Sequence, residues 1–258
     1  MTIFKFILLG CAGILAANAA EAQQQNSNPD GWEASIGTGL ISTPRSLGSQ
    51  KMRTFVVPSF NVLYKDWFFA SPIDGIGVKT SGNNLTFSAA IGMDTNTRDP
   101  KAGGRYSELS KINIAPALRL RAAYEYGPFS TEAVISSRLG NATKNGTTLT
   151  LEEGYELYAA ERTLVTVGVS TRLMNSTFAR NLVSISETDS VNSGLPIFAA
   201  KSGLLDVGLF AQMIYPINDR WTIFSKVGVN KLEGDAKKSP INERGTSPEV
   251  LLFVNYTF

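Results

Sequence analysis

Apolar and polar residues alternate with a period of two along most of the chain. Between positions 111 and 126, for example, Leu118 and Leu120 alternate with Arg119 and Arg121. A period of two places successive side chains on opposite faces of a β-strand. No segment shows the 3.6-residue period of an amphipathic helix strongly enough to compete. The pattern therefore predicts an all-β protein.

Twelve segments carry this alternation, and many of them run for 10–14 residues. Strands of soluble proteins cluster at about 5–6 residues, whereas a tilted transmembrane strand needs about 9–11. After residue 22, no apolar run approaches 18 residues, so insertion into a membrane requires the strands of a closed antiparallel barrel. The expected strands are 32–42, 52–65, 67–80, 84–95, 111–126, 128–139, 147–160, 163–174, 179–186, 204–217, 221–232 and 250–258.

Aromatic side chains gather beside three short turns, at 65–66, 127–128 and 218–220. Rings at these places are typical of the interfacial girdle of a transmembrane β-barrel. The edge aromatics of a β-sandwich would explain one such cluster, but three are harder to explain in that way. The aromatic residues are Tyr64, Trp67, Phe68, Phe69, Tyr124, Tyr126, Phe129, Tyr215, Trp221 and Phe224. The longer polar segments 95–110, 187–202 and 233–247 are expected to be surface loops.

The number of strands and the position of the turns disagree in one respect. If all short turns lie at one end of the barrel, an even number of strands must separate residues 65 and 127, and likewise 161 and 218. The pattern places three strands in each interval. Either some short turns lie at the opposite end, or 67–80 and the region near 195–204 each contain an additional strand, for a total of fourteen. Because the halves of 67–80 are too short to span a membrane, we predict twelve strands, with fourteen as the alternative.

The first 22 residues have the pattern of an export signal. Lys5 precedes an apolar stretch that ends near Ala17, and small residues follow at the spacing of a cleavage site. We expect cleavage after Ala22, which leaves a periplasmic arm at 23–31 and a single barrel domain at 32–258. An exported chain of this architecture is expected in the outer membrane of a Gram-negative bacterium, in contact with lipid.

The only cysteine, Cys11, lies within this signal in a Leu-Leu-Gly-Cys sequence that resembles a lipidation site. The apolar run before it is short against the roughly 7–15 residues of a signal-peptide core. Lipidation of Cys11 is therefore the less favoured alternative, and removal with the signal leaves no thiol in the mature chain.

The last segment alternates in the way that resembles the recognition signal of the barrel assembly machinery. One face of this strand is apolar throughout, whereas the other is mixed. The apolar face consists of Val250, Leu252, Val254, Tyr256 and Phe258. We predict that this strand is both a wall of the barrel and its assembly signal.

Candidate chemistry is sparse. The chain contains no histidine, which excludes Ser-His and Cys-His pairs and histidine metal sites. Glu152 and Glu153 are adjacent in the sequence and point to opposite faces of a strand, so they do not form a catalytic pair. The net charge of +2 without a basic segment gives no reason to expect nucleic acid as a partner. We predict no catalytic residues, no cofactor and no metal.

Arg119 and Arg121 share one face of a predicted strand. A cationic side chain at mid-membrane on the lipid face costs about 2–4 kcal/mol, so both are expected to face the lumen. They line either a pore or an internal network of salt bridges that fills the lumen, and the filled lumen is favoured because a barrel of this size accommodates side chains in its interior.

Three stretches together resemble the MipA/OmpV family of outer-membrane proteins. They are WFFASPIDGIGVKT at 67–80, SGLPIFAAKSGLLDVGLFAQMIYPINDRW at 193–221 and LEGDAKKSPINERG at 232–245. The resemblance implies a non-enzymatic scaffold that holds a lytic transglycosylase near a murein synthase, and the expected binding surface is the periplasmic turns and the arm 23–31. Members of the family are also associated with solute passage and adhesion, so a passive channel lined by Arg119 and Arg121, or an adhesin, is the alternative.

Overall fold

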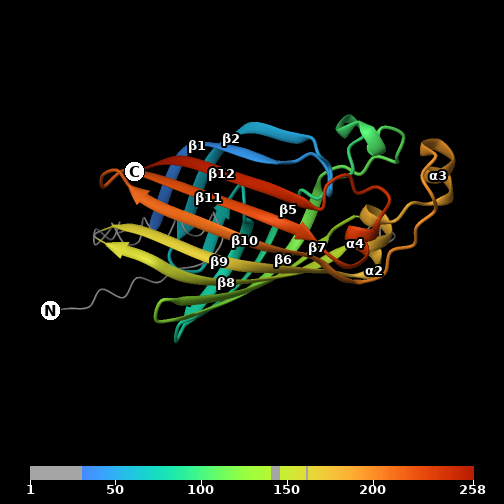
Figure 1. Ribbon diagram of the computed structural model, residues 1–258. Helices are drawn as coiled ribbons and strands as arrows, with labels where there is room; N and C mark the ends of the chain where they lie inside the picture. The colour runs from blue at the N-terminus through green and yellow to red at the C-terminus, as the bar shows by residue number, and fades with distance from the viewer. Residues whose placement is uncertain (1–30, 141–145, 161) are drawn as a thin grey trace.

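The computed structural model describes residues 31–140, 146–160 and 162–258. Within these residues, twelve antiparallel strands close into a barrel, in which each strand pairs with its neighbours in the sequence and β1 pairs with β12 (Figure 1). The predicted export signal, Cys11 and the arm up to residue 30 lie outside the described residues. The strands are β1 (Trp32–Pro44), β2 (Met52–Tyr64), β3 (Phe68–Ser71), β4 (Gly75–Gly82), β5 (Leu85–Asp94), β6 (Ala115–Tyr126), β7 (Phe129–Arg138), β8 (Thr147–Ala160), β9 (Thr163–Met174), β10 (Gly203–Pro216), β11 (Trp221–Leu232) and β12 (Thr246–Thr257).

The predicted fold class and number of strands are confirmed, but two segments differ from the prediction. The segment 67–80 forms a hairpin of two short strands, β3 and β4, because Pro72 has no N–H for a ladder and Gly75 adopts a φ of 94°. The segment 179–186 is not a strand, since Ala179–Val183 forms the helical turn η4, which directly follows α2 (Ser176–Phe178) and its N-cap Asn175. One strand is gained and one is lost, so the total stays at twelve.

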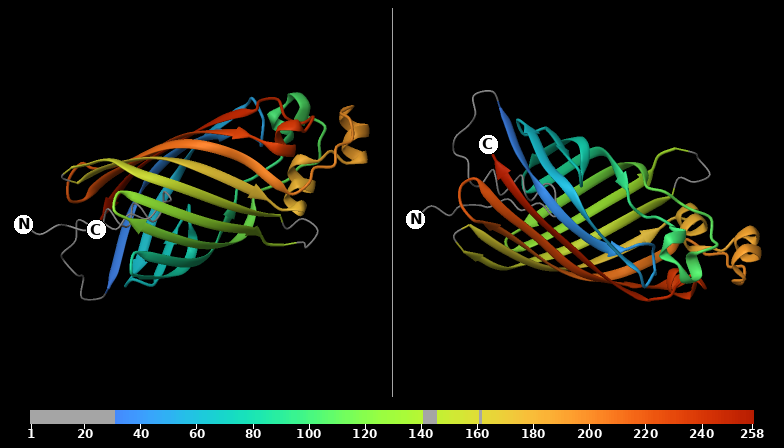
Figure 2. Two further views of the ribbon diagram at one scale, coloured as in Figure 1. Left: turned by 60° about the horizontal axis from the view of Figure 1, so that its bottom comes forward. Right: turned by 90° about the horizontal axis from the view of Figure 1, so that it is seen from above.

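This correction also removes the disagreement between the number of strands and the turns. Four strands, β3 to β6, lie between residues 65 and 127, and two, β9 and β10, lie between residues 161 and 218. With the exception of the turn between β3 and β4, the short turns therefore lie at one end of the barrel, here named the turn end. The long connections lie at the other end, here named the loop end, where the helices gather (Figure 2).

The alternation along the strands separates a lipid face from a lumen face. Large apolar side chains on the outward face are exposed over the whole circumference; examples are Ile36, Ile91, Leu120, Leu209 and Leu252. Inward-facing polar side chains are buried; examples are Ser35, Thr86, Glu132, Thr166 and Asn255. An apolar outer band around a polar interior is the pattern of a transmembrane β-barrel.

Aromatic rings encircle the turn end, as the sequence predicts. Ring pairs form between neighbouring strands, with centroids 4.4 Å apart for Trp32 and Tyr64 and 5.1 Å apart for Trp221 and Tyr256. Two of the aromatic residues assigned to the girdle are exceptions, because Phe69 and Phe224 face the lumen and are buried. The period of two places them on the face opposite to Phe68 and Ile223. Within the described part of the chain, no helix has the length and apolar character needed to cross a membrane.

The long connections fold together into a cap over the loop end. Two apolar clusters hold it: one joins Phe178, Leu182 and Ala236 to the upper ends of β10 and β11, and the other joins Tyr106, Ile185 and other apolar residues. The cap contains η1 (Pro100–Ala102), η2 (Gly104–Tyr106), α2 (Ser176–Phe178), η4, α3 (Glu187–Ser193) and α4 (Gly234–Lys238). The segments predicted as surface loops thus form a packed structure with its own core.

A buried ion pair fastens two of these loops to each other. Arg98 Nη1 lies 3.0 Å from Asp189 Oδ2, and Ser110 donates to Asp189 Oδ1 from its backbone N–H (2.9 Å) and its hydroxyl (2.6 Å). Burial alone raises the pKa of the Asp189 carboxyl, but the hydrogen bonds from Ser110 and the charge of Arg98 outweigh burial and hold this pKa below its ordinary value.

We predict that the cap loosens in acid. A carboxyl with a depressed pKa stabilises the folded state above its ordinary pKa of about 3.9 and loses this contribution as the pH falls further. Below about pH 4 the Ser110 amide should therefore exchange with solvent faster than the intrinsic pH dependence requires. Hydrogen exchange followed by mass spectrometry measures this, with the amide of Thr257 at the turn end as control. Equal acceleration at both amides would contradict the prediction.

Candidate functional site

The tip of the β3–β4 hairpin turns into the lumen and forms a plug. Ile73, in the turn between the two strands, packs against an apolar cluster on β10, β11 and β12 that consists of Ile214, Phe224, Leu251 and Phe253. Phe224 is fully buried and Phe253 is 3% exposed. Because Ile73 reaches these strands through the interior, apolar side chains close the barrel at this level.

Hydrogen bonds hold the hairpin tip in this position. Arg119 Nη1 donates to the carbonyl oxygen of Ile73 over 2.6 Å, and the Ser71 hydroxyl donates to Asp74 Oδ2 over 3.0 Å. The Asp74 N–H donates in turn to the Ser71 hydroxyl over 2.9 Å. The stretch 67–80 thus contributes two strands to the wall of the barrel and, at its turn, the plug.

Ion pairs fill the lumen next to the plug. Arg121 Nη2 lies 2.5 Å from Glu132 Oε2, and both side chains are buried. Lys226 on β11 lies 3.1 Å from Glu152 on β8, and two strands lie between them in the wall, so this pair spans the lumen. The same ammonium group lies 4.3 Å from the ring centroid of Phe210. The interior is therefore a packed network at this level.

The residues singled out from the sequence occupy different places. Arg119 and Arg121 both turn into the lumen, but Arg119 holds the hairpin tip and Arg121 pairs with Glu132. On the lipid face of β12, the side chains of Val250 and Leu252 are exposed, and those of Val254 and Tyr256 are partly covered. Phe258, which directly follows β12, is exposed. Their recognition by the assembly machinery stays a prediction.

The two adjacent glutamates point in opposite directions. Glu152 enters the ion pair with Lys226, whereas Glu153 is exposed on the outer face, where the Thr131 hydroxyl donates to it over 2.6 Å. In the described residues, no group of three or more His, Cys, Asp or Glu side chains is placed to hold a metal ion.

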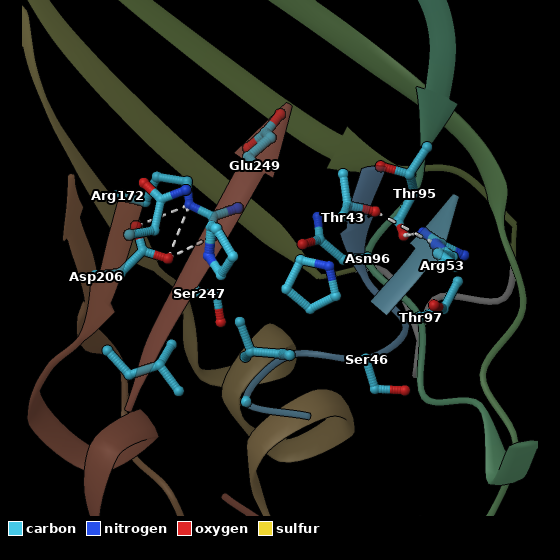
Figure 3. A pocket seen from close by; sticks show the side chains of 16 residues that line it. Thr43, Ser46, Arg53, Thr95, Asn96, Thr97, Arg172, Asp206, Ser247 and Glu249 are labelled. Atoms are coloured by element: carbon cyan, nitrogen blue, oxygen red, sulfur yellow. Dashed lines mark hydrogen bonds and ion pairs between the residues drawn. The ribbon is translucent and has the colours of Figure 1, made fainter. Parts of the chain in front are cut away.

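Between the plug and the cap lies a pocket of about 220 Å³ (Figure 3). It is lined by β1, β2, β9 to β12, the segment 46–48 between β1 and β2, and the segment 95–97 that follows β5. Because these parts are distant in the sequence, no local motif predicts the pocket, and the sequence analysis did not identify it. The charged side chains that line it are Arg53, Arg172, Asp206 and Glu249.

The two arginines of the pocket have different surroundings. Arg172 is neutralised by Asp206, to which its Nε donates over 2.9 Å and 3.0 Å and its Nη2 donates as well. Arg53 lies on the opposite wall, where its Nη2 donates to the carbonyl oxygen of Thr95 over 3.2 Å. Small-molecule sites usually measure about 300–1,000 Å³. This pocket therefore has room for a small polar group rather than for a large solute.

Comparison with known proteins identifies one family. A family model described as MltA-interacting protein MipA matches residues 36–258. A comparison with curated protein sequences gives no match.

Several solved outer-membrane porins resemble the barrel in outline. The KdgM porin in complex with disordered oligogalacturonate has a TM-score of 0.40 and 11% identity, over 88% of this chain and 99% of that chain. The NanC porin has a TM-score of 0.44 and 6% identity, over 86% and 98%. The Salmonella typhi OmpF complex with daunomycin has a TM-score of 0.39 and 10% identity, over 89% and 98%. With TM-scores this low, these similarities carry no further conclusion.

We predict that the lumen network contributes strongly to stability. The substitution Glu132→Ala removes the ion-pair carboxylate beside the buried Arg121 guanidinium, and loss of a buried ion-pair partner costs about 3–5 kcal/mol. The matched substitution Asp219→Ala breaks the exposed pair with Arg162 at the turn end and costs at most about 1 kcal/mol. Urea unfolding of the refolded barrel in lipid vesicles measures both values. Similar losses for the two variants would contradict a structural role for the Arg121–Glu132 pair.

Proposed function

Because the chain belongs to the MltA-interacting protein MipA family, we propose that it is a non-enzymatic scaffold that holds a lytic transglycosylase near a murein synthase. The barrel lies in the outer membrane of a Gram-negative bacterium. In this class of barrel the short turns face the periplasm and the long loops face outward, so the turn end faces the murein layer. The cap then lies on the outer surface of the cell.

The closed lumen is the observation that supports a scaffold most directly. The plug around Ile73 and the ion pair between Lys226 and Glu152 occupy the interior, where a channel needs continuous water. A rigid, filled barrel still presents fixed surfaces to partners on both sides of the membrane. The function is therefore assigned to a surface rather than to the lumen.

The turn end offers charged, exposed side chains for such a partner. Asp66 lies in the turn after β2, and Asp219 and Arg220 lie in the turn after β10. Asp219 forms an exposed ion pair with Arg162 in the turn after β8, and Arg220 donates to the Tyr256 hydroxyl over 3.0 Å. These contacts link the turns after β8 and β10 to the end of β12, which pairs with the first residues of β1.

A passive channel is the second candidate, and the charged side chains on the lumen face favour it. A channel requires that the hairpin tip leaves the lumen, because in this conformation the plug closes the barrel. The two candidates thus differ in whether the plug moves.

We predict that replacing acidic residues at the turn end weakens binding of the murein enzymes. The double variant Asp66→Lys/Asp219→Lys should raise the Kd for a purified lytic transglycosylase at least tenfold, which is about 1.4 kcal/mol. The control Glu108→Lys/Glu187→Lys makes the same change in charge on the cap and should leave the Kd within twofold. Surface plasmon resonance on barrels in nanodiscs measures both. If the native barrel binds neither a transglycosylase nor a murein synthase, the scaffold proposal is wrong.

We predict that the native barrel shows no steady conductance in planar lipid bilayers. The variant Ile73→Gly/Phe253→Ala removes apolar contacts of the plug and should produce conducting events. Steady conductance of the native protein would instead favour the channel. In that case Arg119→Gln/Arg121→Gln should change the ion selectivity, and unchanged selectivity would exclude these residues as the selective lining.

A further inference from the structure

The wall of the barrel is incomplete on one side of β2. On its other side β2 pairs with β1 over its whole length, from Met52 to Tyr64. Towards the hairpin, only Val62, Leu63 and Tyr64 have partners, because β3 ends at Ser71. On the far side of the hairpin, β4 pairs with β5 as far as Ile91. Among the described residues, no strand therefore pairs with Met52–Asn61 of β2 on the side of the hairpin, because the hairpin is too short to reach them.

The register shows which backbone groups face this gap. The Lys65 N–H donates to the carbonyl oxygen of Gly31, and the Arg45 N–H donates to that of Lys51. In this register the odd-numbered residues of β2 direct their backbone N–H and C=O groups towards β1. The even-numbered residues Thr54, Val56 and Pro58 consequently direct their backbone groups into the gap. Pro58 has no N–H, and proline on an exposed edge prevents pairing with another strand. The edge is thus built to stay open rather than to accept an additional strand.

The exposure of side chains confirms an opening at this place. Thr54, Phe55 and Val56 are all exposed, although consecutive residues of a closed wall alternate between the two faces. Phe55 pairs with Ile41 in the register and so points to the lumen, yet it is 38% exposed. Val56 on the lipid face is 72% exposed. The exposure of Phe55 on the lumen face and of Val56 on the lipid face agrees with a missing strand beside this part of β2.

The upper corner of this opening is the Arg53 side of the pocket. Arg53 donates to Thr95, which follows β5, and its guanidinium carbon lies 5.7 Å from the ring centroid of Phe55. Among the described residues, no carboxylate lies within ion-pair distance of Arg53, whereas Arg172 pairs with Asp206. The nearby Asp99 is engaged by Arg45 at 3.0 Å. Glu249 lines the opposite side, next to Arg172 (Figure 3).

We propose that the gap between β2 and the β3–β4 hairpin is a lateral binding site for a single-chain anionic amphiphile of the fatty-acid class. The carboxylate lies beside Arg53, where a guanidinium forms charge-assisted hydrogen bonds. The hydrocarbon chain passes Phe55 and Val56 into the apolar band of the membrane. The pocket of about 220 Å³ holds a carboxylate and a few methylene groups, which favours a fatty acid over a phospholipid head group.

The site does not depend on the scaffold proposal, because it lies at the opposite end of the barrel from the turn surface. Labelling with a photoreactive palmitate that carries a diazirine on its chain tests it directly. The full chain is placed in phospholipid nanodiscs, irradiated and mapped by peptide mass spectrometry. We expect adducts on β2 near Val56 and on the neighbouring end of β5 near Met93. Adducts spread evenly over the lipid face would overturn the proposal.

Variants and competitors test the two parts of the ligand separately. Arg53→Gln should lower the labelling of β2 at least fivefold, Arg53→Lys should retain it, and the exposed control Arg180→Gln should leave it unchanged. Val56→Trp should obstruct the chain, whereas Val227→Trp, on the lipid face of the fully paired β11, should not. Excess palmitate should displace the probe and hexadecanol should not. Displacement by both, or no effect of Arg53→Gln, would exclude recognition of the carboxylate.

Discussion

The ladder of backbone hydrogen bonds around the barrel is the constraint on which the rest of the structure depends. In lipid, a backbone N–H or C=O group has no water to bind, so each strand needs a partner on both sides. Pairing of β1 with β12 closes the ladder, and the antiparallel order places all long connections at one end. The outer apolar band, the turn-end girdle and the loop cap all follow from this closure.

The short β3–β4 hairpin is the place where the ladder is interrupted, and two features have this common cause. Since Pro72 and Gly75 turn the chain back early, the tip around Ile73 is free to enter the lumen and complete the plug. The same early turn leaves β2 without a paired strand on the side of the hairpin, from Met52 to Asn61. A barrel that is closed along its axis and open at its side is suited to contacts with the membrane rather than to passage of water.

The period of two was sufficient to predict a β-barrel with a lipid face and a lumen face, because this period follows from the local geometry of each strand. It placed Arg119 and Arg121 on the face opposite to Leu118 and Leu120, and both arginines turn inward in the structure. It failed at 67–80, where the apolar run of a hairpin looks like one long strand. It failed again at 179–186, where the helical turn η4 follows α2 and packs its apolar residues into the core of the cap. Local pattern alone does not distinguish these cases, since the choice depends on packing against distant segments.

The sequence by itself determined that this protein is an all-β barrel with an apolar exterior, because strand periodicity and length are local properties that lipid selects strongly. The predicted total of twelve strands was right because a missed strand at 67–80 offset a wrongly predicted one at 179–186. Only the tertiary structure decided what the interior does. Ile73 meets Phe253, Lys226 meets Glu152 and Arg53 remains apart from Asp206 because closure of the barrel brings distant strands around one lumen. Such contacts depend on the register of distant strands, which has no local signature in the chain. They also depend on the short hairpin, whose Pro72 and Gly75 mark a turn but not the direction in which its tip points.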